Sequence, residues 1–305
     1  MSEVSIPFHS LTQLNLTAKI HALWTSPLSH TALTPQVIER GDIELPDRLL
    51  TQVVIPEMAE VTPEQPNGIA LLILPGGGYT RVAWDKEGMD TAYAMAKVGY
   101  TSFVLNYRMP GDNHPLGSLT ALADAQRAMR IIRAKAVNLG IRHIVVTGFS
   151  AGGHLAGWLA TQSDRVCYEA QDEIDQFSAR PDLAALLYPV ISMSPSITHL
   201  GSRQQLLGTL ADQELHPEFS VETMVTTDTP PCFLLHASDD PSVSANNSIV
   251  MWQALKAQQV PVEMHIVEEG GHGFGLRKTQ GLPVQGWPQW LNRWIRQHLL
   301  VNSKK

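Results

Sequence analysis

From residue 68 onward, short apolar runs alternate along the chain with segments in which apolar residues recur at helical spacing. The apolar runs predict buried strands at Ile69–Leu74, Tyr100–Tyr107, Ile144–Thr147, Leu183–Ile191, Phe233–Ala237 and Val262–Val267. The periodic segments predict helices at residues 86–98, 118–139, 151–162, 243–259 and 287–300. Continuously apolar strands that alternate with helices indicate an α/β fold with a mostly parallel central sheet and helices on both faces.

Two regions depart from this alternation. Residues 1–66 are rich in Pro, Thr and Gln, with short apolar stretches near Leu49–Ile55, and predict an N-terminal arm or a pair of edge strands. Residues 193–230 lie between two predicted strands and indicate a small cap over the sheet edge. We therefore expect residues 1–305 to form one domain.

Composition and charge narrow the function. The chain has 305 residues, 44% hydrophobic and 17% charged, with a net charge of −7 and no basic run, so we expect no nucleic-acid partner. No apolar stretch approaches the length of a membrane span, and the first residues do not resemble a secretion signal, which predicts no membrane partner and a cytoplasmic location. The two cysteines, Cys167 and Cys232, are far apart, which also favours a reducing compartment. The oligomeric state stays open, a homo-oligomer included.

The pentapeptide Gly148–Gly152 is the first sign of chemistry. It follows the predicted strand Ile144–Thr147 and begins the next predicted helix, which is the strand–turn–helix setting of a nucleophile elbow. Small residues on both sides of a central serine are needed where the chain turns so sharply. We predict that Ser150 is a catalytic nucleophile.

A serine hydroxyl needs a base, and the base needs an acid that orients it. His272 lies in a glycine-rich loop directly after the last predicted strand, which makes it the best candidate for the base. Asp240 follows the strand before that and precedes a helix, and we predict that it is the acid; Asp239 is the alternative. His236 fits a structural hydrogen-bonding role, and His199 shows no role that faces the serine.

An oxyanion hole requires converging backbone N–H groups. Ala151 follows the serine and provides one, and the glycine turn after Ile69–Leu74 provides Gly77 and Gly78. Aromatic and arginine side chains near this sheet edge have a structural role at least as often as they contact substrate. We therefore assign no role to five such residues: Tyr79, Arg81, Trp84, Tyr107 and Arg108. The chain contains no phosphate-loop motif, dinucleotide fingerprint or zinc-spaced cluster, and we expect no cofactor and no metal.

Several stretches carry a resemblance to a known family. They are Pro75–Tyr79, Leu105–Pro110, Gly148–Leu155, Pro181–Leu183, Tyr188–Ile191, Ser202–Arg203, Leu206–Gly208, His236–Asp240 and Gly270–Gly275. Over roughly residues 46–295, the chain resembles the bacterial α/β-hydrolases called acetyl esterases or acetylxylan esterases, relatives of the hormone-sensitive-lipase-like carboxylesterases.

The resemblance implies the α/β-hydrolase fold, a triad of Ser150, Asp240 and His272, and hydrolysis of short acyl esters, acetyl above all, often on sugars. The chain departs from the lipase-like relatives at one place. Their His-Gly-Gly-Gly is here Pro75–Gly78, so the histidine that braces their oxyanion loop is absent. We therefore expect a cofactor-free serine carboxylesterase whose partner is a small-molecule ester. A serine peptidase of the prolyl-oligopeptidase type and a catalytically silent hydrolase-fold binding protein remain as alternatives; the natural ester is not determined.

Overall fold

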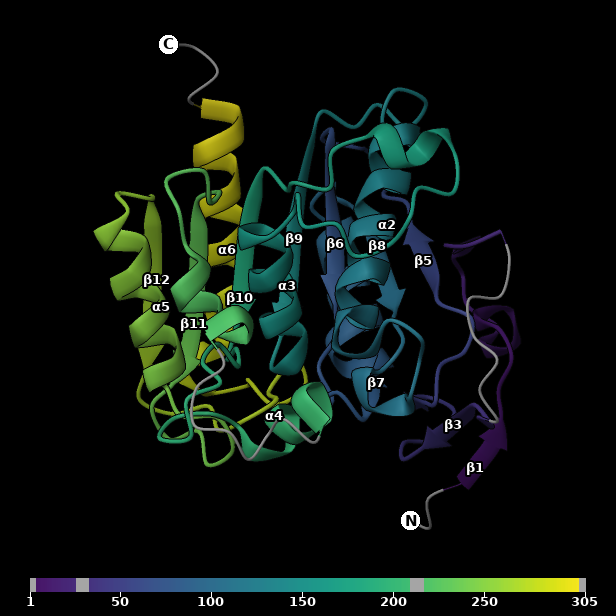
Figure 1. Cartoon of the computed structure of the whole chain (residues 1–305), viewed down its shortest axis with the longest axis horizontal. Coiled ribbons are helices and arrows are strands. Elements are labelled where there is room, and N and C mark those ends of the chain that lie inside the picture. Colours follow the sequence, from purple (N-terminus) through teal and green to yellow (C-terminus); the bar gives the residue numbers. More distant parts are fainter. Residues whose placement is uncertain (1–3, 26–32, 209–216, 302–305) are drawn as a thin grey trace.

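A long, twisted sheet forms the centre of the molecule. The computed structural model describes residues 4–25, 33–208 and 217–301, and in these residues the main sheet has the strand order β12-β11-β10-β9-β6-β8-β5-β2 (Figure 1). Its strands are β2 (Lys19–Ala22), β5 (Glu57–Val61), β6 (Ile69–Leu74), β8 (Thr101–Asn106), β9 (His143–Phe149), β10 (Leu183–Leu187), β11 (Cys232–Ala237) and β12 (Val262–Val267). All neighbours from β8 to β12 pair in parallel, and β5 pairs antiparallel with both β8 and β2.

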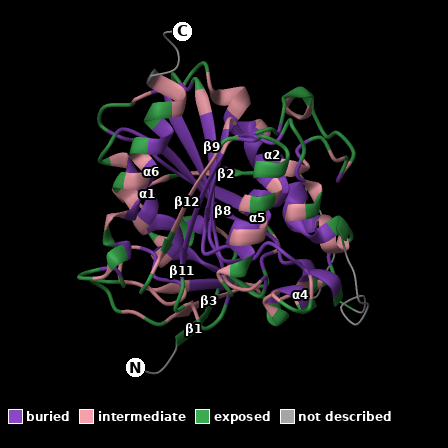
Figure 2. Cartoon of the chain, turned by 90° about the vertical axis from the view of Figure 1, so that its left-hand side faces the viewer, coloured by how far each residue is buried: buried purple, intermediate pink, exposed green. Residues whose placement is uncertain are grey.

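Helices cover both faces of this sheet. They are α1 (Asp90–Ala96), α2 (Thr120–Lys135), α3 (Ala151–Thr161), α5 (Asn246–Ala257) and α6 (Trp287–Arg296). Figure 2 shows α1 and α6 on one side of the strands and α2 and α5 on the other, with the buried residues concentrated between them. Every residue of β6, β8, β10 and β11 is buried, which explains why these strands are mostly apolar in sequence and do not alternate between apolar and polar residues. The predicted parallel sheet with helices on both faces is confirmed.

Most predicted elements differ from the structure by a few residues at their ends, and in two of them the backbone conformation changes within the predicted range. The run Leu183–Ile191 is apolar throughout, but β10 ends at Leu187 because Tyr188 has a φ of 36° and Pro189 follows it. The predicted helix at residues 86–98 begins as a π-helical turn at Trp84–Met89 before α1. Both departures lie where the chain passes the carboxyl ends of the strands.

The N-terminal region contributes to two sheets. Besides the edge strand β2, it supplies β1 (Val4–Pro7), β3 (Gln36–Glu39) and β4 (Arg48–Thr51) to an antiparallel sheet of order β1-β3-β4-β7. Strand β7 (Arg81–Ala83) comes from the segment after the glycine turn, so this second sheet is attached directly to the predicted oxyanion loop. Residues 1–3 and 26–32 of the predicted arm lie outside the described residues.

The region predicted as a cap, residues 193–230, contains the short helix α4 (Leu200–Leu207) and 3₁₀ turns at Pro217–Phe219 and Val221–Met224; its residues 209–216 lie outside the described part. In Figure 1, α4 lies at the same end of the main sheet as β3 and β7. Within the described ranges, none of the helices has the length and apolarity that crossing a bilayer requires.

The arm is hydrogen-bonded to a buried ion pair of the main body. The Arg108 guanidinium, after β8, contacts the Asp124 carboxylate of α2 at 2.6 Å and 3.0 Å, with both side chains almost completely buried. Trp24 Nε1 donates to the same carboxylate at 2.8 Å, so the indole of the arm completes its hydrogen bonding. Removing one partner of such a pair leaves an uncompensated charge in the interior.

We therefore expect Asp124→Ala to lower the free energy of unfolding by about 3–5 kcal/mol, because Arg108 is left buried without a counter-charge. Urea denaturation followed by circular dichroism measures this loss. Asp164→Ala, which truncates an exposed aspartate, should change stability by less than about 0.5 kcal/mol. Equal effects of the two substitutions would contradict this account.

Candidate active site

Ser150 lies at a strained turn between β9 and α3. Its φ of 54° and ψ of −120° are unfavourable for every residue type except glycine. Two hydrogen bonds hold the backbone in this conformation: Ser150 N–H donates to Leu187 O (3.0 Å), and Val190 N–H donates to Ser150 O (3.0 Å). A Cβ on Gly152 would collide with the carbonyl oxygens of Leu74 and Pro75. The glycine is required because the turn brings α3 directly against the end of β6.

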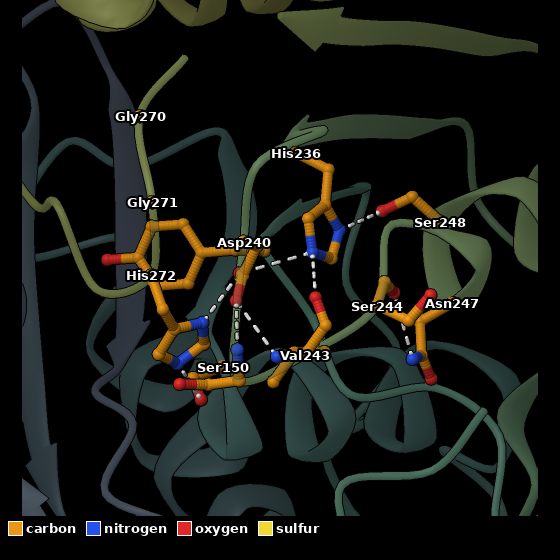
Figure 3. A network of polar contacts seen from close by, with 12 residues as sticks. Ser150, His236, Asp240, Val243, Ser244, Asn247, Ser248, Gly270, Gly271 and His272 are labelled. Atoms are coloured by element: carbon orange, nitrogen blue, oxygen red, sulfur yellow. Dashed lines mark hydrogen bonds and ion pairs between the residues drawn. The ribbon is translucent and has the colours of Figure 1, made fainter. Parts of the chain in front are cut away.

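The structure brings the three predicted catalytic side chains into one relay (Figure 3). Ser150 Oγ lies 3.0 Å from His272 Nε2, and His272 Nδ1 lies 2.7 Å from Asp240 Oδ2. A carboxylate only accepts, so His272 Nδ1 carries the proton and Nε2 is left to accept the serine proton. This arrangement is the one that general-base assistance of a serine nucleophile requires.

The two neighbouring aspartates have different contacts. Asp239 Oδ1 accepts the N–H groups of Gly270 (3.0 Å) and Gly271 (2.8 Å), and so holds the loop that carries His272. Asp240 reaches the imidazole itself, and its carboxylate is completely buried. The geometry therefore supports Asp240, and Asp239 contacts only the backbone of the loop.

The charge of Asp240 is stabilised from three sides. Burial alone would raise the pKa of this carboxyl, but hydrogen bonds from His236, His272 and the Val243 N–H bring it far below the ordinary range. His236 Nε2 donates to Val243 O at 2.9 Å and lies 3.4 Å from Asp240 Oδ2 (Figure 3). His236 thus makes the structural contacts expected of it, but one of them reaches the candidate acid.

The predicted oxyanion donors lie around Ser150. Gly76 packs so closely that a Cβ there would come within 2.8 Å of Ser150 Cβ, and Gly77 and Gly78 follow with φ values of 134° and 67°. Among the described residues, no acceptor takes the N–H of Gly77 or Gly78. Ala151 N–H begins α3, where the helix itself offers it no partner. These three N–H groups are available to a bound anion.

Glu87, which the sequence did not single out, holds this glycine loop in place. Its Oε2 accepts the Gly76 N–H at 2.7 Å, and its Oε1 accepts the Tyr188 hydroxyl at 3.0 Å. Burial and the nearby Glu87 raise the pKa of Tyr188 far above its usual range, so the phenol keeps the proton that it donates. The Tyr188 hydroxyl also accepts the Gly275 N–H at 3.2 Å, and its ring packs on the His272 imidazole at 5.2 Å.

Glu87 therefore links the oxyanion loop, the end of β10 and the histidine loop. The glycine loop is thus held by a carboxylate, whereas the resemblance implies a histidine brace in the lipase-like relatives. No local sequence pattern distinguishes it from the neighbouring acid Asp85, whose carboxylate is instead paired with Arg48.

A second buried contact holds the other end of the glycine loop. Tyr79 has a φ of 60°, and its hydroxyl donates to His154 Nδ1 at 2.8 Å, while His154 Nε2 donates to Phe219 O at 2.7 Å. The loop, the nucleophile helix and the cap region are thus connected through one imidazole. Burial lowers the pKa of His154 to about 4.

Ser150 and His272 line a cavity of about 360 Å³. Its wall includes Gly77 and Gly78 from the oxyanion loop, and α4 contributes Gln204 and Gln205 from the cap region. His199, at the start of α4, also lines it; this contact joins segments far apart in sequence and was missed for that reason. A wider groove of about 700 Å³ lies along Arg48 and Arg277 and includes none of the candidate catalytic residues.

The other side chains left open by the sequence divide into two groups. Arg81 lines the cavity. Trp84 and Tyr107 are fully buried, the latter donating its hydroxyl to Pro75 O at 2.7 Å, and Arg108 belongs to the ion pair with Asp124. Across the described ranges, His, Cys, Asp and Glu side chains form no group of three or more that could hold a metal ion.

Comparison with known proteins identifies relatives with this architecture. The BD-FAE family model matches residues 61–255, a segment that includes Ser150 and Asp240. The chain is 32% identical to an acetylxylan esterase of Xylanibacter ruminicola over 72% of its own length, and 35% identical to endo-1,4-beta-xylanase B of Butyrivibrio fibrisolvens over 71%. These matches span only 44% and 34% of the two relatives.

A solved structure resembles most of the chain. The acetyl ester-xyloside bifunctional hydrolase of Caldicellulosiruptor lactoaceticus is 33% identical, with a TM-score of 0.71, over 92% of this chain and 96% of that one. The carboxylesterase Cest-2923 of Lactobacillus plantarum, at 21% identity and a TM-score of 0.64, shares the fold. The predicted α/β-hydrolase fold and the predicted resemblance to acetylxylan esterases are confirmed.

The Glu87 brace predicts a loss of turnover. We expect Glu87→Gln to lower kcat roughly ten- to hundred-fold with little change in KM, because one amide oxygen cannot accept from both Gly76 and Tyr188, and misplaced oxyanion donors slow the reaction far more than they weaken binding. Steady-state rates with p-nitrophenyl acetate measure the two constants separately.

Glu57→Gln is the matched control, since Glu57 is also a buried carboxylate that accepts two hydrogen bonds, from Ser10 and Leu11, but outside the cavity. It should reduce stability while leaving kcat unchanged. A similar kcat for both variants would contradict the bracing role of Glu87.

The low pKa of the buried His154 predicts that stability depends on pH. The unfolded chain takes up a proton on this imidazole near its ordinary pKa of 6.5, whereas the folded chain does so only near 4. The contribution of His154 to the free energy of unfolding is therefore fully present above about pH 6.5. It falls as the pH decreases toward 4, by at most about 1.4 kcal/mol per pH unit for one proton. Urea denaturation of wild type and His154→Gln between pH 4 and 8 measures the difference. Curves that stay parallel below pH 6.5 would contradict it.

Proposed function

The chain belongs to the BD-FAE family of α/β-hydrolase esterases, and from this we propose that it is a serine carboxylic-ester hydrolase that removes short acyl groups, acetyl above all, from acetylated sugars. The observation that carries the proposal is the relay of Ser150, His272 and Asp240 at 3.0 Å and 2.7 Å, open to a cavity. The relatives named as acetylxylan esterase and acetyl ester-xyloside hydrolase support the acyl group and the sugar.

In the proposed mechanism, Ser150 Oγ attacks the ester carbonyl carbon while His272 Nε2 takes the hydroxyl proton. Asp240 holds the imidazole and stabilises the imidazolium that forms. The N–H groups of Gly77, Gly78 and Ala151 stabilise the tetrahedral oxyanion.

The C–O bond to the alcohol then breaks, and His272 gives its proton to the departing oxygen. A water molecule, deprotonated by His272, attacks the acyl-enzyme and releases the carboxylic acid. The proton ends on Ser150, so the enzyme is restored and no cofactor is consumed.

A cytoplasmic location is part of the proposal. Cys167 and Cys232 are both buried free thiols, and neither requires an oxidising compartment. Cell fractionation with an antibody to the chain would test it.

Ser150→Ala tests the mechanism. We expect turnover of p-nitrophenyl acetate to fall by roughly a million-fold, because the nucleophile is lost and only the residual catalysis by the oxyanion N–H groups and by binding remains. Ser163→Ala, a buried serine outside the cavity, serves as the control and should keep wild-type turnover. Wild-type activity in Ser150→Ala would overturn the proposal.

The same preparation separates the rival functions. Rates on acetyl, butyryl and octanoyl esters and on acetylated xylo-oligosaccharides are compared with rates on dipeptide anilides. Cleavage of the anilides in preference to the esters would support a peptidase. Absence of both activities, together with no labelling of Ser150 by a fluorophosphonate, would indicate a silent binding protein.

A further inference from the structure

The wall of the candidate active-site cavity is positively charged. Its charged side chains are Arg40, Arg81, Lys86 and Glu87. Both Glu87 oxygens already accept hydrogen bonds, from Gly76 and Tyr188, so this carboxylate is turned to the protein. Three cations thus face the cavity of a chain whose net charge is −7.

Lys86 is placed beside the candidate base. Its stem runs along the backbone of Gly275, and its Nζ lies 3.5 Å from the position that a Cβ of Gly273, the residue after His272, would occupy. The side chain is half-buried, and within the described residues it makes no hydrogen bond or ion pair. Burial lowers the pKa of Lys86, and the Glu87 carboxylate opposes that shift.

Arg81 lies five residues before Lys86, at the start of β7. Its backbone and Cγ pack against Gly77 of the oxyanion loop, while its side chain is exposed at the cavity wall. No described residue pairs with its guanidinium. Arg40 differs, because its Nη2 contacts Asp47 at 2.7 Å and its charge is already compensated.

The two carboxylates whose charge acts on Lys86 are those of Glu87 and Asp47. Both already accept hydrogen bonds from other groups, so a bound anion would add to the compensation of this half-buried cation. Arg81 and Lys86 lie on one segment, β7 and the π-helical turn after it, but Arg81 packs against the oxyanion loop and Lys86 against the histidine loop. Both line the cavity that Ser150 lines, so an anion bound there would lie beside the reacting ester. The acetyl group carries no charge, and the anion must therefore belong to the alcohol part of the substrate. Gln204 and Gln205 of α4 add amide groups suited to the hydroxyls of a sugar.

We propose that Lys86 and Arg81 form a subsite for an anionic group, carboxylate or phosphate, on the sugar that carries the acyl ester. The inference rests on the proposed esterase function and specifies its substrate class. Lys86 acts as a point charge, and the Arg81 guanidinium offers paired donors that match either anion.

The test compares three methyl glycosides acetylated at the same hydroxyl: a glucoside, a glucuronide and a glucoside 6-phosphate. Acetate release gives kcat/KM for each at ionic strengths of about 0.01 M and about 1 M, between which the Debye length falls from about 30 Å to about 3 Å. We expect at least one anionic ester to exceed the neutral ester roughly ten-fold at low ionic strength, and this preference to shrink at high ionic strength.

Lys86→Met and Arg81→Met keep most of each stem and remove the charge. Each should lower the ratio of kcat/KM for the preferred anionic ester to that for the neutral ester by several-fold. Lys256→Met, on the exposed face of α5, is the matched control and should leave the ratio unchanged.

Hydrolysis of the neutral ester with equal or higher kcat/KM than both anionic esters would overturn this inference alone. Equal losses on all three esters in the two variants would overturn it as well, because the cations would then act on the oxyanion or on the fold. Failure of the wild type to hydrolyse any of the three, or p-nitrophenyl acetate, would contradict the esterase function itself.

Discussion

The left-handed backbone of Ser150 is the constraint on which the site depends. A φ of 54° is unfavourable for a residue that carries a side chain. This conformation persists because β6, β10 and α3 converge on the turn. The parallel sheet makes this convergence possible, since the carboxyl ends of β6, β9, β10 and β11 reach one edge. The oxyanion loop follows β6 and the candidate acid follows β11, so each arrives beside the serine without a long excursion of the chain.

Buried polar contacts then fix the loops that the sheet brings together. Glu87 joins the backbone of Gly76 to Tyr188, and His154 joins Tyr79 to the cap region. Glycine-rich loops have little conformational preference, so their N–H groups converge only where such contacts hold them. A buried carboxylate would normally be unfavourable near a developing oxyanion, but here both of its oxygens are directed to hydrogen-bond donors of the protein.

The electrostatic character of the cavity differs from that of the chain as a whole. An acidic protein places Arg81 and Lys86 at the wall of its candidate active site, both on the segment that follows the glycine loop. Charge placed in this way affects which substrates bind more than it affects the fold, because Arg81 is exposed and Lys86 only half-buried. The same local charge also favours an oxyanion, so substrate choice and transition-state stabilisation draw on one field.

The order of strands and helices, the elbow at Ser150, the candidate base His272 and the pair of candidate acids Asp239 and Asp240 follow from the sequence alone, because each depends on a local pattern placed after a buried strand. The choice between Asp239 and Asp240 needed the tertiary structure, since both follow β11 and only the direction of each side chain separates them. Glu87 and His199 were equally inaccessible, because their contacts with Gly76 and the cavity join segments that no local pattern relates. Local propensity determines which elements form, whereas long-range packing decides which polar side chains meet.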